Sequence, residues 1–423
     1  MKTHITLLTL MLIPVLAAAG PVDSVTTAAP EAGPATLVEY LELARGANPS
    51  LQASRFRAQA ARERIGEARG FPDPSVLYGY WVAPDAMQGR QEIVLMQQFP
   101  FFGKRGLRGD VAASAADVEA SGSVAVALDV DAAVKMSFYD YVRLYETERV
   151  LVEEAGLLAR MRDAIQVRYA AERAQQQDVL KVTLAISQLD DQLTVSRREL
   201  AVLRARLNEL IGRDASAPLP PPQWTVPEVE DLTAEALVDT ALARRPEMAA
   251  ARAEVEMAER MHRLAKKEYI PDFMLGAMYE FGADQEDTWE LMAGINLPLW
   301  LGKRKAGVRA ADAMRTSAGH RLRAEELRAR RDVSEAVERV RAAEERRARF
   351  ETVIVPQAEQ TFQSSEAGYR SSRVDFLDYL DSERTLLSIR REYYAVIADL
   401  GVQIAALERA VAATAASDAT PQP

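Results

Sequence analysis

The chain has 423 residues, a formal net charge of −10 and no cysteine. The missing cysteine excludes disulfides, thiolate metal sites, a cysteine nucleophile and a lipid anchor on an N-terminal cysteine. The acidic balance argues against nucleic acid as a partner, because a basic footprint is absent. His4, His262 and His320 lie far apart in the sequence, so we predict no catalytic residue, no bound cofactor and no metal site.

Residues 1–19 are predicted to be a signal peptide, and the chain is therefore expected to be exported. Lys2 supplies the positive charge, residues 5–16 form the apolar segment, and residues 17–19 are small alanines that suit a cleavage site. No later stretch reads as a membrane-spanning helix, which needs about 20 apolar residues.

The rest of the sequence contains one long unit twice. Residues 44–49 (ARGANP) return 197 positions later as residues 241–246 (ALARRP). Residues 99–105 (FPFFGKR) return as residues 297–304 (LPLWLGKR). This period is far longer than that of a solenoid. We predict two structural repeats, residues 20–230 and 231–413, followed by a flexible tail, residues 414–423.

Each repeat is dominated by a long stretch of helix-favouring composition. Residues 104–211 contain no proline, whereas the second stretch, residues 303–413, is predicted to break at Pro356 and Gly368. Apolar residues recur at helical spacing, which is typical of coiled-coil-like helical hairpins. A soluble rod would have the same composition.

Between the helices lie four strand-like segments. They are residues 75–83, 91–99, 272–281 and 288–297. Each has about the length of a tilted membrane strand, and aromatic residues bracket them, as in the girdles of membrane barrels. A soluble β-sandwich uses the same alternation of apolar and polar residues, but here no second sheet is available to cover the apolar face.

A membrane sheet must close on itself, because open edges cannot lie in lipid. Four strands are too few, since the smallest barrels have about eight. The barrel is therefore expected to be shared between chains, and the sequence alone leaves two, three or four copies open. The predicted fold class is mainly α with a membrane β portion, in which a hollow helical barrel continues the β-barrel.

The helices must leave the membrane and return to it. A helix over residues 104–171 would span about 100 Å, whereas a return over residues 174–211 covers only about 57 Å. We expect residues 246–267 to make up the difference by stacking on that return helix. Residues 49–70 are expected to stack on the C-terminal helix in the same way.

In this order of elements the chain resembles the TolC-like outer membrane factor family, nearest to the exit ducts of heavy-metal and drug efflux pumps. The resemblance rests on three features. They are residues 44–49 and their repeat at residues 241–246, the duplicated strand–Pro–aromatic–Gly-Lys-Arg junctions, and the helix turns at residues 169–180 and 369–381. It implies a homotrimer with a twelve-stranded barrel in the outer membrane of a Gram-negative bacterium and a periplasmic helical tunnel. It also implies two partners, a periplasmic adaptor and an inner-membrane transporter of the RND type.

The second helix turn carries a candidate gate. Asp378 and Asp381 lie one helical turn apart, and symmetry would turn them into acidic rings that favour cations. Arg370 and Arg373 could pair with these carboxylates between neighbouring hairpins. The resemblance implies that such links close the resting duct, and that Tyr369 matches a tyrosine position used there. The alternative is a solvated, charged helix end.

Both helix turns are also candidate docking sites for the adaptor. Where the family usually has glycine in the turn, this chain has Glu172 in one repeat and Ser372 in the other. The candidate docking residues are Tyr169, Glu172, Arg173, Asp178 and Ser372.

Lys104-Arg105 and Lys303-Arg304 begin the long helices, where two cations oppose the helix dipole. Lipid phosphates at that depth would supply the missing anion. With the neighbouring Phe101 and Trp300, these residues are candidate membrane-interface anchors. Exposed charges tolerated at modest cost are the alternative.

The predicted function is a passive duct that carries metal cations or small toxic molecules from an inner-membrane pump to the exterior. One alternative is a type I protein-secretion duct of the same fold. Another is a periplasmic coiled-coil adaptor or structural protein. An adaptor would need lipoyl-like and β-barrel segments around a single hairpin, whereas this sequence has two hairpins.

Overall fold

The computed structural model describes residues 33–81, 89–172, 174–229, 233–282, 286–371 and 373–413. The predicted signal peptide and C-terminal tail lie outside these ranges. The elements, in chain order, are α1 (Leu37–Ala47), α2 (Pro49–Arg69), β1 (Ser75–Tyr80), β2 (Gln91–Phe99), α3 (Lys104–Ala170), α4 (Gln176–Leu210), α5 (Ala234–Arg244), α6 (Pro246–Lys267), β3 (Asp272–Phe281), β4 (Thr288–Asn296), α7 (Leu301–Arg349), η1 (Phe350–Ile354), α8 (Val355–Arg370) and α9 (Phe376–Val411).

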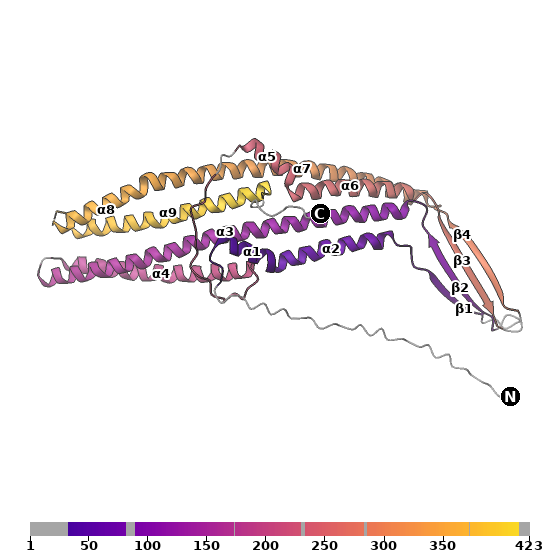
Figure 1. The fold of residues 1–423 in the computed structure, drawn as a ribbon, viewed down its shortest axis with the longest axis horizontal. Helices are drawn as coiled ribbons and strands as arrows, with labels where there is room; N and C mark the ends of the chain where they lie inside the picture. Colours follow the sequence, from indigo (N-terminus) through magenta and orange to yellow (C-terminus); the bar gives the residue numbers. More distant parts are fainter. Residues whose placement is uncertain are drawn as a thin grey trace, which may run out of the picture.

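The helices form a long body with the sheet at one end and two helix–helix turns at the other (Figure 1). α3 and α4 make one helical hairpin, and α7, α8 and α9 make the other. α2 lies along α3, whereas α6 packs against both α3 and α7. The predicted fold class, mainly helical with a small sheet, is confirmed.

Local sequence signals set the helix boundaries. Thr36 caps α1: its Oγ1 accepts the N–H of Glu39, and the Glu39 carboxylate accepts the N–H of Thr36. Asn48 caps α2, with Pro49 at the first helical position. Gly103 precedes α3 with φ +83, a conformation that favours glycine.

The short helices stack on other partners than those expected. Asn48, at the start of α2, donates from Nδ2 to the carbonyl of Leu210 at the end of α4 (2.8 Å). At the start of α6, Glu247 accepts from Arg409, near the end of α9. α2 therefore continues α4, and α6 continues α9, so the prediction that residues 246–267 continue the first return helix was wrong. The reason is that the proline-rich segment after α4 pairs with the segment before α1, which brings α1 and α2 to the end of α4.

The second long helix has a bulge where a break was predicted. The π-helical turn η1 joins α7 to α8, and the N–H of Val355 bonds to the carbonyl of Phe350. Proline has no N–H, and its ring clashes with the preceding turn of an α-helix, so a wider turn accommodates Pro356. Gly368 lies inside α8. The helix is therefore continuous at both positions, and the predicted breaks were wrong.

α3 contains an apolar stretch that contradicts the prediction of no such helix. It is the one described helix that is long and apolar enough to cross a membrane by length and composition. α3 also packs along α1, α2, α4, α6 and α9. It is thus the central helix of the body, although only 17% of its apolar stretch is buried within the chain.

The sheet is antiparallel throughout, with strand order β1-β2-β3-β4. Its central pair, β2 with β3, joins the two repeats and places Phe99 opposite Phe273. β1 ends at Tyr80 and β4 at Asn296, earlier than predicted. Residues 82 and 83 lie outside the described residues. Within the described chain β1 and β4 are edges without a second strand partner.

Apolar clusters hold the helices together along the body. One joins α1, α3 and α4 around Tyr40, Phe138 and Tyr141, and a second joins α5, α7 and α9. A third lies near the helix turns, between α3, α4 and α9. Close contact also depends on Gly401 of α9, where a Cβ would collide with the ring of Tyr139.

Candidate functional site

The two faces of the sheet differ in chemistry. The register collects apolar side chains on one face, and Leu291 and Trp289 there are 86% and 71% exposed. This face, the outer face, carries Gln91 and Gln97 among mainly apolar residues, namely Val76, Tyr78, Tyr80, Ile93, Leu95, Phe99, Phe273, Leu275, Tyr279, Trp289, Leu291, Ala293 and Ile295. The inner face carries Leu77 and Val94 together with methionines and glutamates, namely Glu92, Met96, Met274, Met278, Glu280, Glu290 and Met292. Apolar surface favours removal from water by about 25 cal/mol per Å², so the outer face requires an apolar cover such as lipid.

Aromatic side chains lie at both ends of the strands. Near the β3–β4 turn, the rings of Tyr279 and Trp289 are 4.7 Å apart. At the helical end, Phe101 stacks on Phe273 (6.2 Å), and Trp300 is 80% exposed. Nine strand residues separate such groups by about 30 Å, the thickness of the hydrocarbon core of a bilayer.

Lys104 is held inside the chain, which corrects its predicted role as a membrane anchor. Its side chain is buried, and Nζ donates to Asp272 Oδ1 (2.8 Å) and to the carbonyl of Ile270 (2.7 Å). Asp272 Oδ1 also accepts the N–H of Phe101. The anion that offsets the cation at the start of α3 is therefore Asp272, 168 residues away in sequence, and no lipid phosphate is needed.

The other candidate anchors differ in their contacts. Arg105 donates to the carbonyl of Arg69, and its guanidinium lies 3.5 Å from the centroid of the Phe71 ring. Arg304 pairs with Glu268 (3.2 Å). Lys303 is exposed, so it is the lysine of this group that can face a lipid or another chain.

The first helix turn, between α3 and α4, contains a strained residue. Glu172 has φ +57, in the left-handed region that the family's usual glycine would adopt readily. Asp178 accepts the N–H of Gln175 and so caps α4. Tyr169 is half exposed. Arg173 lies outside the described residues.

In the second turn, between α8 and α9, Tyr369 is packed while the acidic residues are exposed. The Tyr369 ring stacks on Tyr379 with centroids 5.1 Å apart. Asp378 and Asp381 are both exposed on α9. Arg370 pairs with Glu366 of its own helix (2.7 Å). Arg373 is exposed, and Ser372 lies outside the described residues.

The two turns meet across an open groove of about 580 Å³. It brings together two predicted residues, Tyr369 of the second turn and Asp178 of the first. Arg168 of α3 also lines it and places its guanidinium 4.7 Å from the centroid of the Tyr369 ring. The turns of the two repeats are thus linked within one chain.

A pair of buried carboxyl groups was missed by the sequence analysis. Glu383 of α9 is fully buried, and neither of its carboxyl oxygens has a hydrogen-bond partner among the described residues. Burial, with the nearby Glu154 of α3 adding to it, raises the pKa of Glu383 to about 8. Burial also raises the pKa of Glu154. The available signal was the position of Glu383 in an apolar stripe with Phe376, Leu380 and Leu387.

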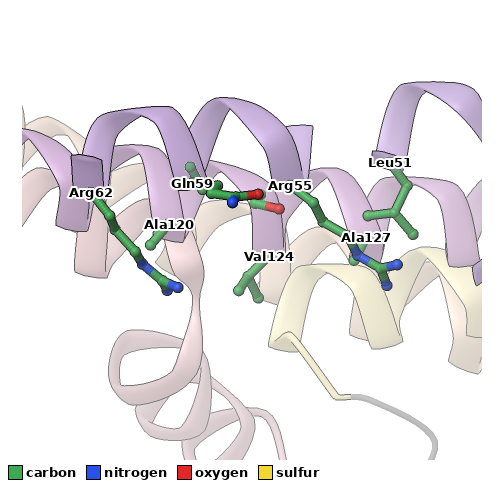
Figure 2. Close-up of a pocket in the computed structure, with 9 residues that line it drawn as sticks. Leu51, Arg55, Gln59, Arg62, Ala120, Val124 and Ala127 are labelled. Carbon is green, nitrogen blue, oxygen red and sulfur yellow. The ribbon is translucent and has the colours of Figure 1, made fainter. Parts of the chain in front are cut away.

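A second open groove, of 540 Å³, runs between α2 and α3. Figure 2 shows Arg55, Gln59 and Arg62 of α2 on one side, with Ala120 and Val124 of α3 beside them. Long polar side chains thus border a floor of small apolar ones. No three acidic or histidine side chains of the described residues are grouped as a metal site.

Comparisons with known proteins agree with this architecture. Residues 237–413 match the family model for outer membrane efflux proteins. The chain is 24% identical over 375 residues to the cobalt-zinc-cadmium resistance protein CzcC of Cupriavidus metallidurans, covering 86% of this chain and 87% of that protein. The predicted resemblance to outer membrane efflux proteins is confirmed.

Solved structures share the fold across most of the chain. The outer membrane protein VceC of Vibrio cholerae superposes with a TM-score of 0.74 at 20% identity, covering 89% of this chain and 95% of that one. The CmeC outer membrane channel of Campylobacter jejuni gives a TM-score of 0.76 at 14% identity, covering 89% and 85%. The predicted fold of the single chain is therefore confirmed.

Proposed function

We propose that this chain, which has the fold of outer membrane efflux proteins, is the outer membrane exit duct of a tripartite efflux system. It conducts its substrate passively and performs no chemistry itself. The observation that carries the proposal is the sheet. Its exposed apolar face and its two edges, which are unpaired among the described residues, adjoin a helical body that α3 extends by about 100 Å. In water such a sheet would be unstable and prone to aggregate.

Closure of the sheet in lipid requires further copies of the chain. Three copies, as the family resemblance implies, give twelve strands and a homotrimer. The helices support the same assembly. α6 and α9 each pack between α3 and α7. Their first-repeat counterparts, α2 and α4, pack substantially against α3 alone within the described chain, which leaves one side of each open to another copy. In the trimer, β1 and β4 join between copies in the membrane, and the helices form the tunnel in the periplasm.

We propose divalent metal cations as the substrate class. One support is the similarity to CzcC, which is named as a cobalt-zinc-cadmium resistance protein. The other is the inner face of the sheet, where Glu92 and Glu290 would repeat around the barrel, while Glu280 is ion-paired with Arg90. Rings of carboxylates attract cations and repel anions.

The helix turns are the proposed gate and the proposed docking site. Asp378, Asp381 and Arg373 are exposed and available to a neighbouring copy or to an adaptor, whereas Tyr369 packs in the groove between the turns. The partners are a periplasmic adaptor and an inner-membrane transporter of the RND type. Trp300 remains a proposed contact at the membrane interface, and the exposed Lys303 is available to another chain.

Three measurements on the purified protein test this function. A barrel protein resists extraction by salt and needs detergent, has the mass of three chains in the micelle, and conducts ions in a planar bilayer. A monomer that dissolves freely in water and gives no conductance would refute the proposal. Deletion of the gene should raise sensitivity to divalent metals, whereas a protein-secretion duct would instead show loss of an exported protein.

A further inference from the structure

Near the sheet, α3 has helices on two sides, whereas its repeat counterpart α7 has no helix of the described chain on one of them. Residues at the start of α3 are largely covered, but residues at the start of α7 are exposed almost throughout. The cover on α3 comes from α2 and α6, and the cover on α7 comes from α6 alone at this end. The open side of α7 therefore matches the position that α2 of another copy would fill.

The seam between β2 and β3 supplies a template for a seam between copies. Lys104 and Asp272 form a buried ion pair there, 2.8 Å long. The Gly-Lys-Arg motif of residues 103–105 recurs 199 positions later, so Lys303 is the counterpart of Lys104. Pro-Asp occurs with the same offset, so Asp73 is the counterpart of Asp272. Both are exposed, and within the described chain neither has an ion-pair partner.

We propose that Lys303 of one copy pairs with Asp73 of the next copy, and that this pair fixes the register in which β4 joins β1. The inference rests on the proposed assembly and adds to it the residues that form each seam. The partner of each open edge of the sheet is then a second copy of this chain. The opposite charges of the two side chains agree with this pairing.

The register follows from the strand positions. At the inner seam Phe99 faces Phe273, so Pro100 and Asp272, the next residues along, face each other. Their counterparts are Pro298 and Asp73. Antiparallel pairing then places Asn296 opposite Ser75, Ile295 opposite Val76, and Ala293 opposite Tyr78. The turns themselves differ, because Gly103 precedes α3 whereas Gly302 lies within α7.

The chemistry of the faces provides an independent check on this register. Ile295 and Ala293 lie on the outer face of β4, and Val76 and Tyr78 lie on the outer face of β1. The proposed register joins these outer faces into one apolar surface. A slip by one residue would place outward side chains opposite inward ones.

The helices supply a second pair of opposite charges. Across α6 and α3, Arg260 donates to the carbonyl of Asp110 (2.8 Å). The repeat counterparts of these two residues are Glu63 of α2 and Arg309 of α7. Both are exposed, and neither has an ion-pair partner in the described ranges. Packing α2 of one copy against α7 of the next therefore brings Glu63 toward Arg309.

Cysteine cross-linking tests the register directly, because the chain has no cysteine of its own. The variant Ala293→Cys/Tyr78→Cys should form disulfide-linked dimers and trimers under mild oxidation in membranes. The matched slipped variants, Ala293→Cys/Leu77→Cys and Ala293→Cys/Gly79→Cys, should give at most a tenth of that yield. Cross-linking that is equal in a slipped variant would overturn the proposed register.

Charge exchange tests the ion pair. Lys303→Asp and Asp73→Lys should each remove most of the trimer that survives dodecyl sulfate without heating, and the double variant should restore it. The control Lys305→Asp changes a neighbouring exposed lysine and should leave the trimer intact. Equal effects of Lys303→Asp and Lys305→Asp, or no rescue in the double variant, would refute the pair.

These outcomes are distinct from failure of the proposed function. A stable, conducting trimer with the wrong cross-links would refute the seam alone. A protein that remains monomeric and does not conduct, with or without the exchange, would refute the duct itself.

Discussion

Arg168, at the turn of the first helical hairpin, places its guanidinium 4.7 Å from the centroid of the Tyr369 ring at the turn of the second. Tyr369 also stacks on Tyr379 and meets the edge of Phe376. A cation over an aromatic face contributes about 0.5–2 kcal/mol. This contact couples the two turns, so in the proposed duct both are expected to move together when the periplasmic end opens.

Tyr369→Ala should therefore loosen the periplasmic end and raise the leak conductance of the trimer in planar bilayers. Arg168→Gln should also raise the leak conductance, but by less. Tyr369→Phe is the matched control and should behave as wild type, because the Tyr369 hydroxyl is buried without a hydrogen-bond partner among the described residues. A leak in Tyr369→Phe as large as that in Tyr369→Ala would contradict a role for ring packing.

Glu172→Gly should stabilise the first turn. Glu172 has φ +57, and a left-handed conformation costs a residue with a Cβ about 1–2 kcal/mol, part of which is offset by the greater freedom of glycine in the unfolded chain. We expect a net gain of about 0.5–1 kcal/mol, seen as slower hydrogen exchange of the turn amides. Ala171→Gly is the control, since its φ of −89 gives glycine no steric advantage. Faster exchange in Glu172→Gly would argue against strain at this position.

The stability of the helical body should fall as the pH rises toward 8. The pKa of Glu383 is raised from 4.5 to about 8 by burial and by Glu154, while Arg384 opposes the shift. Because the folded carboxyl binds its proton more tightly, its stabilising contribution is complete below pH 4.5 and is lost as the pH rises to 8. The slope is at most about 1.4 kcal/mol per pH unit.

Urea unfolding at pH 5, 6.5 and 8 measures this slope. Glu383→Gln should flatten it, because the amide keeps the shape of the protonated carboxyl but does not titrate. The control Glu345→Gln changes an exposed glutamate on α7 and should leave the slope as it is. A wild-type midpoint that does not change between pH 5 and 8 would show that Glu383 is not protonated in the folded state.

Lys104→Met should destabilise the junction between sheet and helices. It leaves the Asp272 carboxylate without its cation in a largely buried position, and breaking such a pair costs about 3–5 kcal/mol. Arg105→Gln removes a more exposed contact and should cost about 1 kcal/mol or less. Unfolding in urea distinguishes the two variants, and equal effects would place the Lys104 pair among ordinary surface contacts.

Asp378→Asn/Asp381→Asn should weaken cation preference at the periplasmic end. Both side chains are exposed, and symmetry would repeat them around the proposed constriction. The readout is the reversal potential under a salt gradient, which should move toward zero. Asp191→Asn on α4 is the control for an exposed acidic residue away from the turns. An unchanged reversal potential in the double variant would remove these two residues from the gate.

The fold class could be predicted because its periodic patterns are local. Alternation along residues 288–297 marks a strand with one apolar face, and long stretches without helix breakers mark the hairpins. The stacking of the short helices could not be predicted, since it depends on the Asn48–Leu210 contact between residues 162 positions apart. Composition carries no information on such a contact.

The candidate site was harder to predict than the fold. In the sequence Lys104 has no visible partner and is interpreted as an exposed cation. Its partner Asp272 is brought beside it only by the pairing of β2 with β3. Glu383 reads as one charged residue on a charged helix, although its place in an apolar stripe marks it as buried. Tyr369 was singled out by resemblance, whereas its contact with Arg168 depends on how the two hairpins pack.

The π-helical turn at Phe350–Ile354 has a mechanical consequence. α3 runs without interruption from the sheet to the first turn, so it is expected to move as one rigid helix. The second long helix has a joint partway, at the widened turn, which is a kind of position where helices kink. Force applied at the end with the helix turns should therefore bend the segment beyond that joint first. α8 and α9 should then swing while the other helices stay comparatively fixed.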